Sequence, residues 1–174
     1  GDLVEIVGPA QCRACHGINY RGTELSRMQM DRVVNTKFGT RHFWKGFQVS
    51  CYACHSSPNN GDNATTNIPA VVASVVTSTP VNDIVQVNLP ASDANGNTLV
   101  LRVISQPDPG SVGISGLTAT YYPERAFEGT STFTYAAWDG WTDSNLATVR
   151  VTVAGGVCEY TIEPASQAFD GLGG

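Results

Sequence analysis

The feature that most constrains this chain is a five-residue motif that occurs twice. Residues 12–16 read Cys-Arg-Ala-Cys-His and residues 51–55 read Cys-Tyr-Ala-Cys-His, so both are copies of C-x-x-C-H. Two thiols three positions apart can each form a thioether with one vinyl group of the same porphyrin. The next residue then presents its imidazole to the iron. The spacing therefore predicts two covalently attached c-type haems.

The two motifs supply both kinds of haem contact. The predicted thioether cysteines are Cys12, Cys15, Cys51 and Cys54, and the predicted proximal iron ligands are His16 and His55. A four-thiolate zinc site would use the same cysteines, but the 35 residues between the two pairs exceed the usual gap. Zinc, two disulfides and a thiol redox pair also give no reason for a histidine directly after each pair.

A six-coordinate iron needs a distal ligand as well. The third histidine of the chain, His42, is the candidate for one of them, and the alternative is a surface histidine in a polar loop. The second iron would take Met28 or Met30, a ligand from outside this chain, or no sixth ligand. Because core packing is the ordinary role of methionine, ligation and packing both remain open for Met28 and Met30.

The composition changes near residue 65, which divides the chain. All three histidines, both methionines and four of the five cysteines precede this point, and alternating Val, Thr and Pro patterns follow it. The polar, turn-forming residues 56–63 are interpreted as the linker. The predicted domains are a dihaem cytochrome c domain at 1–65, a β-sandwich at 66–155 and a tail at 156–174.

In the N-terminal part, one helix is predicted over residues 24–34, with Thr23 as its N-cap and Gly39 ending it. About 65 residues are too few to build a good core alone, so haem faces would supply the missing apolar surface. The predicted fold is therefore a small haem-centred, mostly helical or irregular N-terminal domain.

Beyond the linker the apolar residues alternate with a period of two. Strands are predicted at residues 84–89, 98–104, 132–138 and 147–153, with weaker candidates at 71–76 and 118–122. Clusters of Asp, Asn, Gly and Pro separate them. Six or seven short strands in roughly 85 residues predict an all-β antiparallel sandwich of the immunoglobulin-like type.

Two segments around the second motif carry a resemblance. Residues 26–38, leading into residues 49–55, resemble the haem repeats of the multihaem cytochrome subunits of photosynthetic reaction centres. In those repeats a helix bearing a ligating methionine precedes a Cys-Tyr-x-Cys-His. The resemblance implies that Met28 or Met30 serves the haem at the second motif, and that His42 serves the other haem.

A second resemblance covers the β-strands. Residues 91–99, 121–123, 127–135 and 138–140 resemble the cadherin-like and immunoglobulin-like repeats of bacterial and archaeal surface proteins. This resemblance implies a cadherin-like sandwich but no particular function. Oxygen ligands for Ca²⁺ could come from turn residues, although forming the turns is their favoured role: these are Asp93, Asn95, Asn97 and Asp139.

The two ends of the chain suggest further expectations. Residues 158–169 look like the opening strand of a BACON-type β-sandwich module, and Cys158 within them has no partner cysteine outside the haem motifs. Gly1 is expected to follow the cleavage of an export signal. Residues 3–7 are apolar and strand-prone, so they could add to the edge of a β-sheet.

Charge and hydropathy exclude two classes of partner. The net charge of −5 and the pI near 5.0 argue against nucleic acid, because no basic stripe exists to neutralise phosphates. No run of about 18 apolar residues occurs, so no membrane span is predicted. Likeness to c-type cytochromes implies haem attachment outside the cytoplasmic membrane. The expected location is extracellular or at the cell surface, with a periplasm-like compartment as the alternative.

Three classes of function remain. The first hypothesis is extracellular electron transfer by a dihaem cytochrome, working as a polymer or array of copies, with partner cytochromes, or as a monomeric periplasmic carrier. The chain is similar in organisation to secreted multihaem cytochromes, some of which polymerise into conductive filaments. The second is a dihaem peroxidase or reductase, which would need one open iron; no acid, base or nucleophile constellation is visible, so an enzyme is not expected. The third is an adhesin-like module whose haems only stabilise a small domain.

Overall fold

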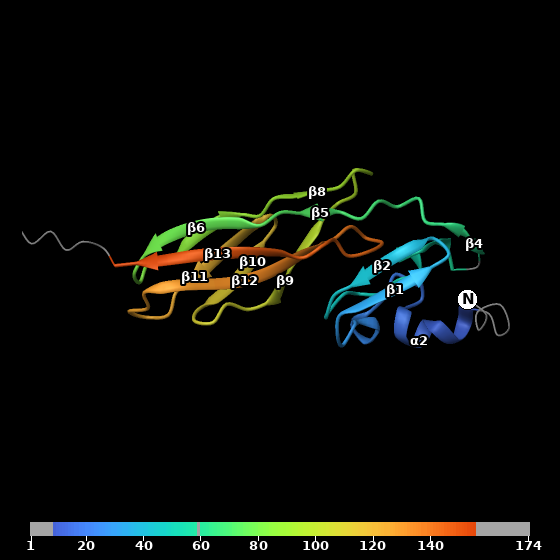
Figure 1. Ribbon diagram of the computed structural model, residues 1–174, viewed down its shortest axis with the longest axis horizontal. Helices are drawn as coiled ribbons and strands as arrows, with labels where there is room; N and C mark the ends of the chain where they lie inside the picture. Colours follow the sequence, from blue (N-terminus) through green and yellow to red (C-terminus); the bar gives the residue numbers. More distant parts are fainter. Residues whose placement is uncertain (1–8, 59, 156–174) are drawn as a thin grey trace, which may run out of the picture.

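The computed structural model describes residues 9–58 and 60–155, and these residues are predominantly β-structure (Figure 1). The chain forms an elongated particle with two parts. The N-terminal unit comprises residues 9–64, and the β module comprises residues 65–155. The N-terminal unit occupies one end of the long axis and the β module occupies the rest (Figure 1).

The β module contains two main sheets. One has four strands in the order β6-β13-β12-β9, the other has three in the order β10-β11-β7, and β5 pairs with β8 beside them. The strands are β5 (Val71–Val72), β6 (Val75–Pro80), β7 (Val85–Asn88), β8 (Ala91–Ser92), β9 (Val100–Ser105), β10 (Ser111–Ser115), β11 (Thr118–Tyr122), β12 (Gly129–Trp138) and β13 (Ala147–Ala154).

The core of the module follows from the period-two pattern. Along β13 buried and exposed residues alternate strictly, and the buried face carries Val149, Val151 and Val153. Residues of β12 and of the second sheet complete the core, including Phe133 and Tyr135. The buried Tyr135 hydroxyl is satisfied, because it lies 2.7 and 3.0 Å from two backbone carbonyl oxygens to which it can donate. The prediction of an immunoglobulin-like sandwich from this alternation is confirmed.

Two details of the module depart from the prediction. Strand β10 was not predicted, because it is short and Gly113 in its interior weakens the strand signal of Val112 and Ile114. Strand β6 pairs with β13 in parallel, whereas an antiparallel sandwich was predicted. Both strands run toward the end of the module that lies away from the N-terminal unit (Figure 1), so their pairing is parallel.

The prediction of a haem-centred, mostly helical N-terminal domain is wrong. The described part of this unit holds one four-residue α-helix, and two hairpins account for most of its regular structure. Its elements are η1 (Pro9–Cys12), α2 (Arg13–His16), η2 (Glu24–Ser26), β1 (Arg32–Thr36), β2 (Gly39–Phe43), η3 (Cys51–Ala53), β3 (His55–Ser57) and β4 (Asn60–Ala64). Within the described residues, no helix is long and apolar enough to cross a membrane.

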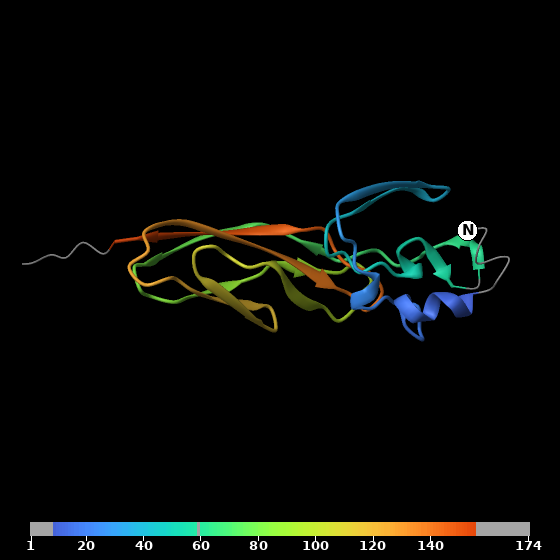
Figure 2. The same ribbon diagram turned by 90° about the horizontal axis from the view of Figure 1, so that it is seen from below.

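The helix predicted at residues 24–34 is replaced by a single turn and a strand. Thr23 does cap a helical turn, since its side chain accepts from the Leu25 amide at 3.2 Å, but the turn ends within three residues. From Arg32 the chain forms the β1–β2 hairpin, which projects along the outside of the unit (Figure 2). β-Branched Val33 and Val34 favour the strand. Gly39, with φ +101°, follows the turn at residues 37–38 and opens β2 rather than ending a helix.

The N-terminal unit has a small core of its own. Phe43, Phe47 and Ala53 are buried, and the partly buried Met28 and Trp44 pack against them. The residues predicted as a linker form the β3–β4 hairpin, in which Ser57 pairs with Asn60. Residues 65–70, which have no regular secondary structure, then lead from this hairpin to β5.

Candidate functional site

The first cysteine motif lies on the turn from η1 into α2. Cys12 is half-buried at the end of η1, whereas Cys15 is exposed within α2. The backbone after the motif is held tightly, because Thr23 Oγ1 donates to the Cys15 carbonyl at 2.5 Å. The Gly22 amide donates to the His16 carbonyl at 2.9 Å. The motif is therefore fixed by contacts within the chain itself.

The His16 ring is oriented by a contact 33 residues away in the sequence. Its Nδ1 lies 2.9 Å from the Val49 carbonyl oxygen. A carbonyl oxygen can only accept, so Nδ1 carries the proton and the lone pair of a neutral ring resides on Nε2. Histidines that ligate metals use this arrangement, in which the second ring nitrogen fixes the tautomer.

The second motif is brought next to the first. Cys51 begins η3 and its amide donates to the Tyr20 carbonyl at 3.1 Å, which ties it to the loop that follows α2. Burial raises the pKa of the Cys51 thiol, and the neighbouring Cys12 and Cys54 thiols raise it further. Cys12 of the first motif therefore lies close enough to Cys51 of the second motif to affect its pKa. The four motif cysteines are free thiols.

His55, the last residue of the second motif, opens strand β3. Its ring is partly buried and meets the Phe38 ring edge-on, with the centroids 5.3 Å apart. Phe38 belongs to the turn of the β1–β2 hairpin, so this turn lies against the second motif.

The candidate distal ligands occupy different environments. Met28 packs against the small core of the N-terminal unit, whereas Met30 is 56% exposed. His42 is exposed on β2, directly opposite Val33 on β1, and it lines a cavity. Tyr52 and Ala53 of the second motif line the same cavity, whereas no residue of the first motif, whose haem the resemblance assigns to His42, does so.

The residues considered for Ca²⁺ hydrogen-bond to backbone amides. Asp93 Oδ1 accepts from the amides of Asn95 and Asn97, both at 2.9 Å. Asp139 Oδ1 accepts at 2.7 Å from the Thr142 amide. These bonds form the turns that the sequence favoured. Within residues 9–58 and 60–155, no group of three or more Cys, His, Asp or Glu is placed to hold a metal ion.

The loop between β12 and β13 joins the β module to the N-terminal unit. Three hydrogen bonds cross to it: Gln48 N to Asp143 Oδ2 (2.6 Å), Ser50 Oγ to the Trp141 carbonyl (2.5 Å), and Trp44 Nε1 to the Ser144 carbonyl (3.0 Å). The Trp141 ring also packs edge-on against Tyr52, with 4.8 Å between centroids. Segment 44–52 is therefore docked onto this loop.

Asp143 is the charged centre of the junction. Its side chain is fully buried, and its Oδ2 forms an ion pair with the guanidinium of Arg102 on β9. Burial raises the pKa of Asp143, while Arg102 and the Gln48 amide act in the opposite direction. Arg102 also donates to the Gly46 carbonyl at 3.2 Å, so it contacts both parts of the chain.

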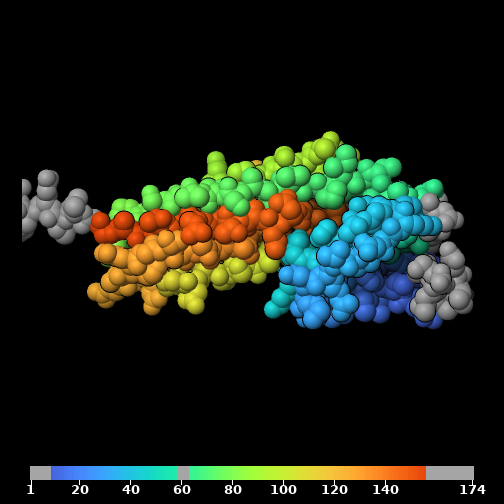
Figure 3. All heavy atoms as spheres, viewed as in Figure 1, coloured from blue at the N-terminus to red at the C-terminus, as the bar shows by residue number. Residues whose placement is uncertain are grey.

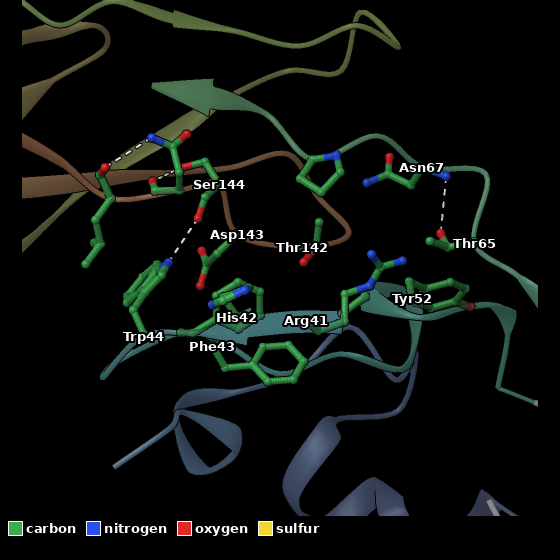
Figure 4. A pocket seen from close by; sticks show the side chains of 15 residues that line it. Arg41, His42, Phe43, Trp44, Tyr52, Thr65, Asn67, Thr142, Asp143 and Ser144 are labelled. Carbon is green, nitrogen blue, oxygen red and sulfur yellow. Dashed lines mark hydrogen bonds between the residues drawn. The ribbon is translucent and has the colours of Figure 1, made fainter. Parts of the chain in front are cut away.

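A cavity of about 370 Å³ lies in this junction (Figure 4). Residues 41–44 of β2 and its following turn, together with Tyr52, form the wall from the N-terminal unit. Residues 142–146 of the β12–β13 loop form the opposite wall. In Figure 4 the Asp143 carboxylate lies between Trp44 and Thr142, facing His42.

The fold and this junction define an immunoglobulin-like β-sandwich that carries a cysteine-rich unit at its N-terminal end. The chain belongs to the bacterial Ig domain family, whose model matches residues 60–152. No curated protein sequence matches the chain.

Several solved structures share distant likeness. The endo-fucoidan hydrolase MfFcnA4 of glycoside hydrolase family 107 is 17% identical with a TM-score of 0.40, over 72% of this chain and 18% of that one. Titin domain M7 is 8% identical with a TM-score of 0.33, over 52% and 98%. A non-cellulosomal cohesin from Archaeoglobus fulgidus is 12% identical with a TM-score of 0.24, over 49% and 92%.

The chain spans less than a fifth of the length of the fucoidan hydrolase. Likenesses this distant carry no information about activity.

Sequence reasoning missed the junction. Asp143 and Arg102 were not singled out, because each is an ordinary polar residue in a strand or turn and their contact spans 41 positions. The nearest signal was the Trp-Asp-Gly sequence at residues 138–140, which contributed to the cadherin-like resemblance. The expectations for Gly1, residues 3–7, Cys158 and residues 158–169 lie outside the described residues.

Proposed function

We propose that this chain is a dihaem c-type cytochrome that transfers electrons outside the cell, as a polymer or array of copies. The observation that carries the proposal is the pair of C-x-x-C-H motifs. Their cysteines are free, Cys51 lies near Cys12, and the His16 ring has its Nε2 lone pair available for a metal. A zinc site, two disulfides or a thiol redox pair would give no reason for a histidine directly after each cysteine pair.

Each motif would hold one haem. Cys12 and Cys15 would form the thioethers of one with His16 as its proximal ligand, and Cys51, Cys54 and His55 would do the same for the other. When bound, a c-type haem supplies a one-electron iron couple. The Val49 carbonyl orients His16, and the Phe38 ring limits the movement of His55.

The surface of the N-terminal unit fits large apolar groups. Among its described residues, four large apolar side chains are more than half exposed: Ile18 (79%), Leu25 (76%), Val33 (61%) and Met30 (56%). Such exposure in a unit of about fifty residues leaves much apolar surface without cover. Porphyrin faces bound at the two motifs would cover surface of this kind, which supports the proposal.

The distal ligands in this proposal are His42 and Met30. The exposed Met30 thioether is free to approach an iron, whereas Met28 already packs against Phe43 and Phe47. His42 is exposed on the same hairpin that follows Met30. The proposal therefore assigns packing to Met28 and ligation to Met30.

The proposed extracellular location and the proposed array of copies are supported by different observations. Thioether attachment to C-x-x-C-H takes place outside the cytoplasmic membrane in c-type cytochromes, and the chain carries a bacterial Ig domain. The particle is elongated, with the cysteine-bearing unit at one end (Figure 3). Copies could therefore bring these units together without displacing the β modules, and the low charge density of 14% permits close packing.

Intact mass spectrometry of the denatured protein tests the cofactor. Two thioether-linked haems should add about 1.2 kDa to the polypeptide, and the colour should stay with the protein after acid-acetone extraction. Cys12→Ala and Cys51→Ala should each impair attachment of one haem. Cys158→Ala, outside both motifs, is the matched control and should keep two. Loss of all colour to the solvent would refute the haem assignment.

Sedimentation and electron microscopy at physiological salt test the array. Copies should associate into species larger than one chain, with cysteine-bearing units of different copies in contact. A single species with the mass of one chain at every concentration would refute the array and would leave a monomeric electron carrier as the function.

A further inference from the structure

Tyr20 lies between the two C-x-x-C-H motifs and is buried outside the small core of the N-terminal unit. It is 6% exposed, whereas the other residues from 17 to 22 are partly or fully exposed. Among the described residues, the core formed around Phe43, Phe47 and Ala53 does not include it. A buried tyrosine ordinarily finds a partner for its hydroxyl group. The contacts of Tyr20 with the two motifs hold it in this position.

The side chain of Tyr20 is anchored on the first motif. Arg13 Nε donates to the Tyr20 hydroxyl oxygen at 2.8 Å, and the Arg13 guanidinium carbon lies 5.5 Å from the centroid of the Tyr20 ring. Arg13 stands between the two cysteines of that motif, Cys12 and Cys15. A hydrogen bond from a charged donor is stronger than one between neutral groups, and a cation near an aromatic ring adds attraction. The ring is therefore fixed to the first cysteine pair from within the motif.

The backbone of Tyr20 is anchored on the second motif. Its carbonyl accepts from the amide of Cys51, the first residue of that motif, at 3.1 Å. Tyr20 has a φ of +58°, in the left-handed region that residues with a side chain rarely adopt. Such a conformation persists only where the surrounding contacts enforce it. One residue thus bonds to the first motif through its side chain and to the second through its backbone.

A second contact joins the motifs at another point. His16 Nδ1, at the end of the first motif, lies 2.9 Å from the carbonyl oxygen of Val49, two residues before the second motif. The Gly22 amide donates to the His16 carbonyl at 2.9 Å, so the loop that carries Tyr20 folds back onto the first motif. Contacts at two points fix both the separation and the angle of the motifs. Groups attached to Cys12 and to Cys51 would therefore keep one mutual arrangement.

We propose that Tyr20 is a positioning residue that fixes the two motifs relative to each other, so that the haems attached there form one electronically coupled pair. The proposal rests on the proposed function, because it needs a haem at each motif. The electronic interaction between two chromophores falls steeply with their separation. Loss of the Tyr20 contacts therefore weakens the interaction and leaves both attachments intact.

Circular dichroism of the full haem-bearing chain in the Soret region tests the coupling. Two coupled haems give a pair of bands of opposite sign, which the wild type should show. Tyr20→Gly accepts the φ of +58° but lacks the ring and the hydroxyl, so it should lose most of the amplitude of this pair. Its absorption spectrum and haem content should be unchanged. A variant that lowers Tm and keeps the full amplitude, or a wild type with two haems and no pair of bands, would overturn the proposal.

A double-mutant cycle tests the bond between Arg13 and Tyr20. Tyr20→Phe and Arg13→Leu should each reduce the amplitude, and the double variant should reduce it no further than the stronger single variant, because both remove the same hydrogen bond. Tyr122→Phe is the matched control, since Tyr122 is an exposed tyrosine on β11 of the β module, and it should keep the full amplitude. Additive losses, or an equal loss in Tyr122→Phe, would contradict the assignment.

Amide hydrogen exchange at Cys51 tests the backbone contact without reference to the haems. The amide should be protected in the wild type, and it should exchange about fivefold faster in Tyr20→Gly, as expected for weakening of one hydrogen bond. Unchanged exchange would show that Tyr20 does not hold the second motif. Intact mass measured on the same samples reports on haem attachment alone. A chain without haem would refute the cytochrome proposal and the coupled pair together, whereas two haems with unchanged exchange would refute only the role of Tyr20.

Discussion

Replacing Asp143 with alanine should destabilise the junction between the two parts of the chain. The substitution removes the partner of the Arg102 guanidinium and the acceptor of the Gln48 amide at one point. Removing one member of a buried ion pair costs about 3–5 kcal/mol. Arg102 is 22% exposed and keeps its bond to the Gly46 carbonyl, so the cost should lie at the lower end, about 3 kcal/mol.

Thermal and urea unfolding followed by circular dichroism measure this cost. For a chain of this length about 3 kcal/mol corresponds to a fall in Tm of roughly 6–12 °C. Asp83→Ala is the control, because Asp83 is an exposed carboxylate in the β6–β7 turn, and it should change Tm little.

A double-mutant cycle assigns the effect to the ion pair. In an Arg102→Met background, Asp143→Ala should cost less than about 1 kcal/mol, because the lost Gln48 hydrogen bond is offset by removal of an unpaired buried carboxylate. Equal costs with and without Arg102 would refute the ion pair as the source. A cost below about 1 kcal/mol in the wild-type background would refute the burial argument itself.

Four further predictions concern other parts of the structure. The folded state raises the pKa of Asp143 above its ordinary value of 3.8. The stability that this group contributes should therefore fall as pH rises from 3.8 through the pKa of the folded state. Unfolding free energies measured from pH 3 to 7 should show this fall in the wild type and not in Asp143→Asn. Gly22→Ala should destabilise by about 1–3 kcal/mol, because a Cβ would lie 2.7 Å from the Val49 carbonyl at φ +91°, and urea unfolding measures it. If Met30 ligates a haem iron, Met30→Ala should abolish a weak absorption band near roughly 695 nm in the oxidised protein. Met28→Ala should keep this band and lower Tm, because Met28 packs in the core. A fragment of residues 66–155 should give an all-β circular dichroism spectrum, because its core is made within the module.

The sandwich could be predicted because its information is local. Most strands of the module repeat an apolar residue at every second position, and β13 carries this alternation over its whole length. Burial of one face is then dictated by the backbone geometry of a strand. The parallel pairing of β6 with β13 was not predictable in this way, since the residues it brings together lie 74 positions apart.

The N-terminal unit defeated the same reasoning because its local signals conflict. Thr23 is a cap, and the absence of Gly or Pro before Gly39 favoured a helix. The hairpin prevails because Val33 and Val34 pair with the second strand beyond the turn at residues 37–38. Phe43 on that strand also reaches a core with Phe47. The bond from His16 to Val49 likewise depends on the folded loop rather than on any pattern near either residue.

The β12–β13 loop connects the bacterial Ig domain to the candidate ligand histidine through three consecutive residues. Asp143 accepts from the amide of Gln48, and Ser50 donates to the loop backbone, so the backbone between them is held from the side of the module. The carbonyl of Val49, lying between these anchors, accepts from His16 Nδ1. A change in the loop should therefore alter the tautomer and orientation of His16 without altering a cysteine of either motif. The module, whose fold implies no function by itself, acts here as the support for the ring that the first motif presents.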